Sequence, residues 1–125
     1  MTEPRTWTLT INRLPVSQND PVWREKWKQY RYKRDWMDDV YWSCREQQIP
    51  ALKCISLSIV VYFKTRAHRD LDNYHPTTCK AIQDGLSHAG VIPTDDERYI
   101  PQLPTLRFFI DCKNPRTEVT VTEIA

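Results

Sequence analysis

The chain has 125 residues and a formal net charge of only +2, so its total charge does not indicate a nucleic-acid partner. A chain of this length is expected to form one domain, residues 1–125, with a core that needs neither disulfides nor a structural metal. The four cysteines are widely spaced, which favours a reduced, cytoplasmic protein over a zinc site, and no apolar run is long enough to span a bilayer.

Residues 7–14 alternate between apolar and polar side chains, which predicts a half-buried strand. Asp20-Pro21 is a typical helix start, and the helix is expected to run to about Gln48, with Pro50 closing it. Its predicted buried stripe comprises Trp23, Trp27, Tyr30, Met37, Tyr41 and Cys44, widened by Trp36 and Val40.

Residues 51–64 form the strongest predicted strand. Five of its apolar side chains share one face: Ile55, Leu57, Ile59, Val61 and Phe63. The other face is less polar than a solvated face should be, which favours a central strand covered on both sides. A second helix is expected from about Pro76 to Ala89, with Gly90 able to take the left-handed conformation that ends it. Its predicted buried stripe comprises Cys79, Ile82, Leu86 and Ala89.

Two more strands are expected, at about residues 98–111 and 117–123. The short Asn114-Pro115 link between them predicts an antiparallel hairpin. The elements therefore follow the order β-α-β-α-β-β. The expected fold class is α+β, with two layers: a mixed sheet and both helices packed on one of its faces.

Asp70 and Asp72 directly follow the strongest strand. In an extended chain, residues i and i+2 point to the same side, so their carboxylates would share one small volume. Both stay ionised there only if a cation lies between them, and Mg²⁺ or Mn²⁺ suits such hard oxygen donors. Because Arg66, His68 and Arg69 surround them, the pattern indicates metal-assisted chemistry on phosphate. The simpler alternative is that each Asp forms a turn or a cap.

A longer pattern is more specific. Between Arg69 and Glu97 the chain reads, in order, R-D-L-D-N, K-A-I-Q-D-G-L, H-A-G-V-I and D-D-E. This resembles the RusA family of Holliday junction resolvases, small endodeoxyribonucleases common in phages and prophages. The flanks agree more loosely, through a turn at residues 15–19. Residues 74–79 make a longer link than in the family's bacterial prototype, which leaves the direction of Lys80 open.

The resemblance implies a Mg²⁺-dependent endonuclease, with Mn²⁺ as a substitute, that resolves four-way DNA junctions by paired phosphodiester hydrolysis in recombination and repair. It also implies a homodimer in the cytoplasm of a bacterial or phage-infected cell. The implied site consists of the metal-binding Asp70, Asp72 and Asp96 and the catalytic Lys80. Asp95 competes with Asp96 for the third position. A solvated pair with Asp84 is the alternative role of Lys80.

Basic residues are concentrated in the first half of the long helix and after the central strand. The candidate phosphate contacts are Lys26, Lys28, Arg31, Lys33, Lys64, Arg66 and Arg69. A merely solvated helix face is the alternative, and the interleaved aromatic residues are expected in the core. Two other functions stay open: another branched-DNA nuclease with the same carboxylates, and a DNA-binding protein without catalysis.

Overall fold

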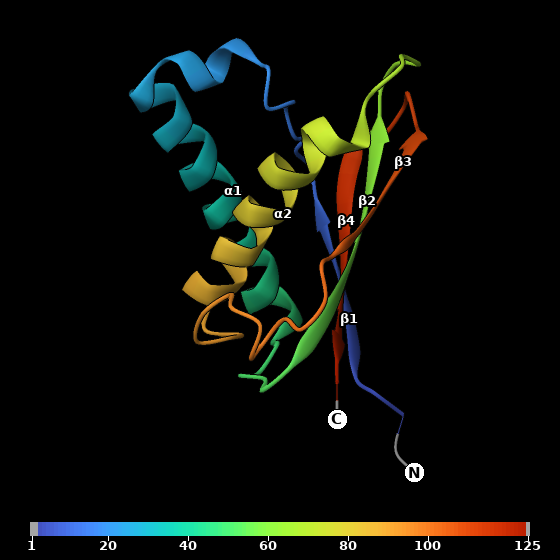
Figure 1. The fold of residues 1–125 in the computed structure, drawn as a ribbon. Coiled ribbons are helices and arrows are strands. Elements are labelled where there is room, and N and C mark those ends of the chain that lie inside the picture. Colours follow the sequence, from blue (N-terminus) through green and yellow to red (C-terminus); the bar gives the residue numbers. More distant parts are fainter. Residues whose placement is uncertain (1–2, 125) are drawn as a thin grey trace.

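The computed structural model describes residues 3–124. A four-stranded mixed sheet forms one layer, and both α-helices pack on one of its faces (Figure 1), which confirms the predicted α+β fold class. The elements are β1 Thr6–Ile11, a 3₁₀ helix η1 Pro21–Arg24, α1 Lys26–Gln47, β2 Ile55–Phe63, α2 Leu71–His88, β3 Thr105–Ile110 and β4 Arg116–Glu123.

The sheet has the strand order β1-β4-β2-β3. β4 runs antiparallel to both β1 and β2, whereas β3 lies on the other side of β2 and runs parallel to it. The predicted hairpin between the last two strands is therefore wrong. Their link passes the end of β2, where the amide of Asp111 donates to the carbonyl of Phe63 at 2.9 Å.

The burial pattern explains why β4 lies inside the sheet. Its inward residues Thr117, Val119 and Val121 are fully buried, so a position with a neighbour on each side covers them best. β3 begins only at Thr105, because the proline-rich stretch before it forms a loop. Four of its six residues are exposed, as suits an edge strand.

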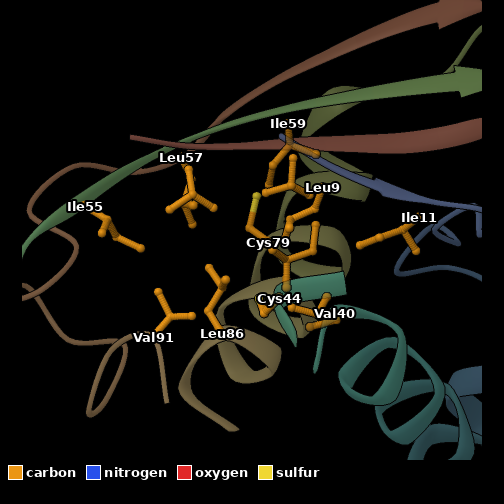
Figure 2. Close-up of a cluster of buried hydrophobic side chains, with 14 of the residues drawn as sticks. Leu9, Ile11, Val40, Cys44, Ile55, Leu57, Ile59, Cys79, Leu86 and Val91 are labelled. Atoms are coloured by element: carbon orange, nitrogen blue, oxygen red, sulfur yellow. The ribbon is translucent and has the colours of Figure 1, made fainter. Parts of the chain in front are cut away.

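β2 carries the centre of the core. All five residues of its predicted apolar face are buried, and Figure 2 shows Ile55, Leu57 and Ile59 facing side chains from the helices. The predicted stripe of α2 is also present, with Cys79, Ile82 and Leu86 buried. The helices cover only one face of the sheet, however, and Ser58 on the opposite face is exposed. Cover on both sides of β2 was therefore a wrong expectation.

The long first helix departs from its predicted stripe. Asp20 caps the short helix η1, and α1 begins only after a break at Glu25. The buried residues of α1 follow a spacing of four: Trp36, Val40 and Cys44. Trp27 and Tyr30, expected in the core, are 59% and 67% exposed. The helix ends at Gln47, and its C-cap Gln48 takes the left-handed conformation at φ 54°.

α1 and α2 approach each other closely at Gly85. A Cβ atom at this position would lie only 2.6 Å from Cβ of Val40. Glycine is thus required here by the contact between the helices. Gly90 follows the end of α2 with φ 79°, as expected of a residue in the left-handed region.

The four cysteines are free in the structure. Burial raises the pKa of the Cys44 and Cys79 thiols to about 12, because desolvation disfavours the thiolate. These two side chains act as part of the hydrophobic core, between the sheet and the helices (Figure 2). Within residues 3–124, no helix is both long and apolar enough to cross a membrane.

Candidate functional site

Asp70 and Asp72 lie where the segment after β2 enters α2. Asp70 is the N-cap of the helix, and its Oδ1 accepts a hydrogen bond of 3.0 Å from the amide of Asp72. Aspartate suits this position because its carboxylate satisfies an amide that has no partner within the helix. Asp72 lies in the first turn, where the helix dipole favours negative charge. The extended arrangement predicted for the two acids is therefore wrong, since Asp72 is already helical.

α2 begins at Leu71, and Pro76 lies inside it rather than in its first turn. Proline has no amide hydrogen, so it cannot donate to the carbonyl four residues earlier, which is that of Asp72. Asp72 therefore offers a carboxylate and a carbonyl that lacks its usual helical partner, both hard oxygen donors of the kind that Mg²⁺ binds. The hollow of about 400 Å³ beside it is lined by Leu71, Asp72, His75, Pro76, Leu103 and Leu106.

The loop before η1 packs against the first turns of α2. Gln18 bonds Asn73 twice, from its amide to the Asn73 carbonyl at 2.8 Å and from Nε2 to Oδ1 at 2.9 Å. Thr77 Oγ1 donates to the carbonyl of Val16 at 2.6 Å. These bonds fix the start of α2, and they engage the Asn73 side chain with Gln18 rather than with a carboxylate.

The connection from β2 to Asp70 is basic. The Arg69 guanidinium lies 3.8 Å above the ring of Phe63 and donates to the carbonyl of Thr65 at 3.2 Å, so it is folded onto its own loop. Lys64 and Arg66 are exposed and make no ion pair with any residue from 3 to 124. The two acids at the start of α2 thus follow a segment with positive charges open to solvent.

Lys80 lies at the centre of a second charged group, further along α2. Its Nζ is 2.6 Å from Oδ2 of Asp95 and 3.1 Å from Oδ1 of Asp84. The hydrogen bond to Asp95 is the main cause of a raised Lys80 pKa. The alternative role predicted for Lys80, an ion pair with Asp84, is therefore found in the structure. Asp95, from the loop after α2, is a second and closer partner.

Asp96 turns to a different partner from Asp95. Arg98 binds it through Nη2 at 2.7 Å and lowers the pKa of its carboxyl. Of the two neighbouring aspartates, Asp95 is thus directed at α2 and Asp96 at the loop's own arginine. Which of them acts with Asp70 and Asp72 stays a prediction.

The carboxylates form separate groups. Asp72 and Lys80 are eight residues apart on one helix, about 12 Å along its axis. Asp70 lies at the start of α2, whereas the loop that carries Asp95 and Asp96 follows the other end of this helix and turns back there (Figure 1). No three His, Cys, Asp or Glu residues between 3 and 124 lie together as a metal-binding group. The donors of Asp70 and Asp72 suit a hard cation in kind, but the three-aspartate set is not assembled in this arrangement.

The Lys80 group leads to a prediction about pH. Because the Lys80 pKa is raised, its ammonium group should persist to higher pH than that of an ordinary lysine. Replacing Asp95 by Asn should lower this pKa, and Asp84→Asn should lower it less, since the Asp95 hydrogen bond is the largest cause. An NMR titration of the Lys80 Nζ resonance measures the three values. An equal titration in all three proteins would contradict the ion pair.

Sequence reasoning missed an exposed aromatic surface on α1. It placed Trp27 and Tyr30 in the core because they fit helical spacing, although both have basic neighbours on the same helix. The useful signal was the strict spacing of Trp36, Val40 and Cys44, which already defines one buried face. A groove of about 240 Å³ lies between this helix and α2. It is lined by Gln18, Trp23, Tyr32, Lys33, Pro76, Thr77, Lys80, Ala81 and Asp84.

No protein-family model matches the chain, and no curated protein matches it either.

Proposed function

We propose that the protein is a Mg²⁺-dependent, structure-selective DNA endonuclease that resolves Holliday junctions by paired phosphodiester hydrolysis. The observation that carries the proposal is the pair Asp70 and Asp72 at the start of α2, directly after a basic segment. The likeness of residues 69–97 to the RusA family supports it. Such hydrolysis needs acids that bind a divalent cation, placed within a surface that attracts phosphate.

The chain's own residues would divide the work. Lys64 and Arg66 would hold the DNA backbone without reading its sequence. Asp70 and Asp72 would hold the cation, which when bound would neutralise charge on the phosphate and acidify a water. Lys80 would stabilise negative charge on the reacting phosphate, and to do so its ammonium group would exchange Asp95 or Asp84 for a phosphate oxygen. Asp96 is assigned as the third acid from the resemblance alone.

The proposed partners are branched DNA and a second copy of the chain. A two-fold dimer would present two sites to opposed strands, which suits paired nicks across a four-way junction. The proposed compartment is the cytoplasm of a bacterial or phage-infected cell. Mn²⁺ is expected to replace Mg²⁺, since both take oxygen ligands.

One observation favours a second candidate, a DNA-binding protein without catalysis. Lys80 is already paired with two carboxylates, those of Asp84 and Asp95. A protein in this arrangement would attract DNA through its basic segment and leave the phosphodiester bonds intact.

Cleavage of a synthetic four-way junction tests the two candidates against each other. The protein is incubated with Mg²⁺ or Mn²⁺ and with either the junction or linear duplex of the same arm sequence. Paired nicks in the junction and intact duplex are expected. Equal cleavage of both substrates would remove junction selectivity and favour a less selective nuclease, and binding without cleavage would favour the non-catalytic candidate.

A further inference from the structure

The first half of α1 presents two aromatic rings to solvent. Trp27 is 59% exposed and Tyr30 is 67% exposed. Residues three, four and seven apart share one face of a helix, so Arg31 and Arg34 lie on the same face as these rings. We call Trp27, Tyr30, Arg31 and Arg34 the aromatic-basic face. Single exposed rings are normal on a protein surface, so the feature that indicates a binding surface is the combination of two rings with two arginines on one face.

The charge around this face is strongly positive. Residues 24–34 contain six basic side chains and one acid, Glu25. Lys26, Arg31, Lys33 and Arg34 form no ion pair with residues 3–124. The second half of the same helix is acidic, with Asp35, Asp38, Asp39 and Glu46. Within α1, the excess of positive charge that would attract a polyanion therefore lies in the first half of the helix, which also exposes Trp27 and Tyr30.

The two rings are held by contacts with charged neighbours. Lys28 Nζ lies 5.5 Å from the centre of the Trp27 ring, and the Trp27 indole N–H donates to Glu25 Oε2. Arg34 lies 6.0 Å from the centre of the Tyr30 ring. Rings held in this way lose less conformational freedom when another flat group stacks on them.

We propose that the aromatic-basic face binds unpaired nucleotides, with Trp27 and Tyr30 stacking on bases and Arg31 and Arg34 contacting phosphates. Single-stranded nucleic acid is the ligand that combines flat apolar groups with a dense negative charge. The inference rests on the proposed function in taking DNA as the partner. The first turns of α1 and α2 lie at the same end of the molecule (Figure 1), and Lys33 and Lys80 line the groove between the helices, so a strand on α1 would continue toward the candidate site.

Trp42 provides a matched control for Trp27. It lies on the same helix and is 62% exposed, but it lines a hollow with Glu46 and with Asp39, which is paired with Arg13 at 2.7 Å. Trp27→Leu and Trp42→Leu therefore remove the same group from similarly accessible positions, of which only that of Trp27 lies among several unpaired basic side chains of the described residues. Because both side chains are exposed, both variants should fold, and circular dichroism checks this.

The experiment measures binding of a fluorescein-labelled oligothymidylate, and of an abasic oligonucleotide of the same length, in EDTA by fluorescence anisotropy. Trp27→Leu should weaken oligothymidylate binding about 5- to 100-fold and leave abasic binding unchanged, because only bases stack. Trp42→Leu should change neither. No loss in Trp27→Leu, or an equal loss with both probes, would overturn the inference.

Binding in EDTA separates this inference from the proposed endonuclease. Junction cleavage together with unchanged oligothymidylate binding in Trp27→Leu would overturn the stacking face and leave the nuclease standing. Base-dependent binding through Trp27 in a protein that cleaves no junction would support the stacking face and remove the nuclease. Absence of any oligothymidylate binding by the wild-type protein would overturn the inference regardless of the cleavage result.

Discussion

Asp70→Asn should reduce junction cleavage by at least about 100-fold while the protein remains as stable as the wild type. Loss of a group that only supports a metal ligand commonly costs 10- to 100-fold, so loss of a proposed ligand's charge should cost at least the upper value. Asn caps a helix as well as Asp does, so the hydrogen bond to the Asp72 amide is retained. The variant thus removes charge and preserves the start of α2. Cleavage rates with Mg²⁺ and urea unfolding measure the two effects.

Asp20→Asn is the matched control. Asp20 caps η1 by accepting a hydrogen bond of 2.9 Å from Val22, so the same change is made at a second cap. It should leave both cleavage and stability unchanged. Asp72→Asn should resemble Asp70→Asn in cleavage. If both variants at the start of α2 cleaved at the wild-type rate, these acids would not take part in the reaction, and the proposed function would lose the observation that carries it.

The parts of the fold that the sequence predicted are those governed by local patterns. Apolar side chains at every second residue of 55–63 identified β2 and its buried face, because one face must point to the core. The cysteine and aliphatic stripe of α2 was equally clear. The strand partners were not predictable in this way. The Asn114-Pro115 turn is present between β3 and β4, but a turn residue does not reveal that both strands flank β2.

The sequence predicted which residues form the candidate site better than it predicted how these residues are arranged. A proline five positions into α2 was interpreted as a helix start, although Asp70 already supplied a cap. Cap and dipole signals at residues 70–72 outweighed the single proline, so the acids became helical. The pairing of Lys80 with Asp95 depends on how the loop after α2 folds back, and no spacing rule specifies the path of that loop.

Gly85→Ala should destabilise the protein by about 1–2 kcal/mol. Val40→Ala removes the two Cγ atoms of Val40 but keeps its Cβ, so it should relieve only part of that loss. An added Cβ would lie 2.6 Å from Val40 Cβ and 2.8 Å from Val40 Cγ1, and overpacking of this kind costs about 1–3 kcal/mol or more. The gain from alanine's higher helix propensity is about 1 kcal/mol. The Val40 Cβ is fixed to its backbone, so the helices must separate. Urea unfolding of the four proteins in the double-mutant cycle measures the coupling.

Gly90→Ala distinguishes crowding at Gly85 from a general intolerance of glycine replacement. Nothing lies within 4 Å of an added Cβ at Gly90, but its φ is +79°, so alanine there should cost about 1 kcal/mol through backbone conformation alone. Val40→Ala should not relieve that cost, whereas it should relieve part of the cost at Gly85, by about 0.5–1 kcal/mol, through the loss of the Cγ contacts. Equal behaviour at the two sites would contradict the close approach of α1 and α2. Because α1 and α2 both line the groove that holds Lys33 and Lys80, a confirmed coupling would also identify one contact that holds the two helices together.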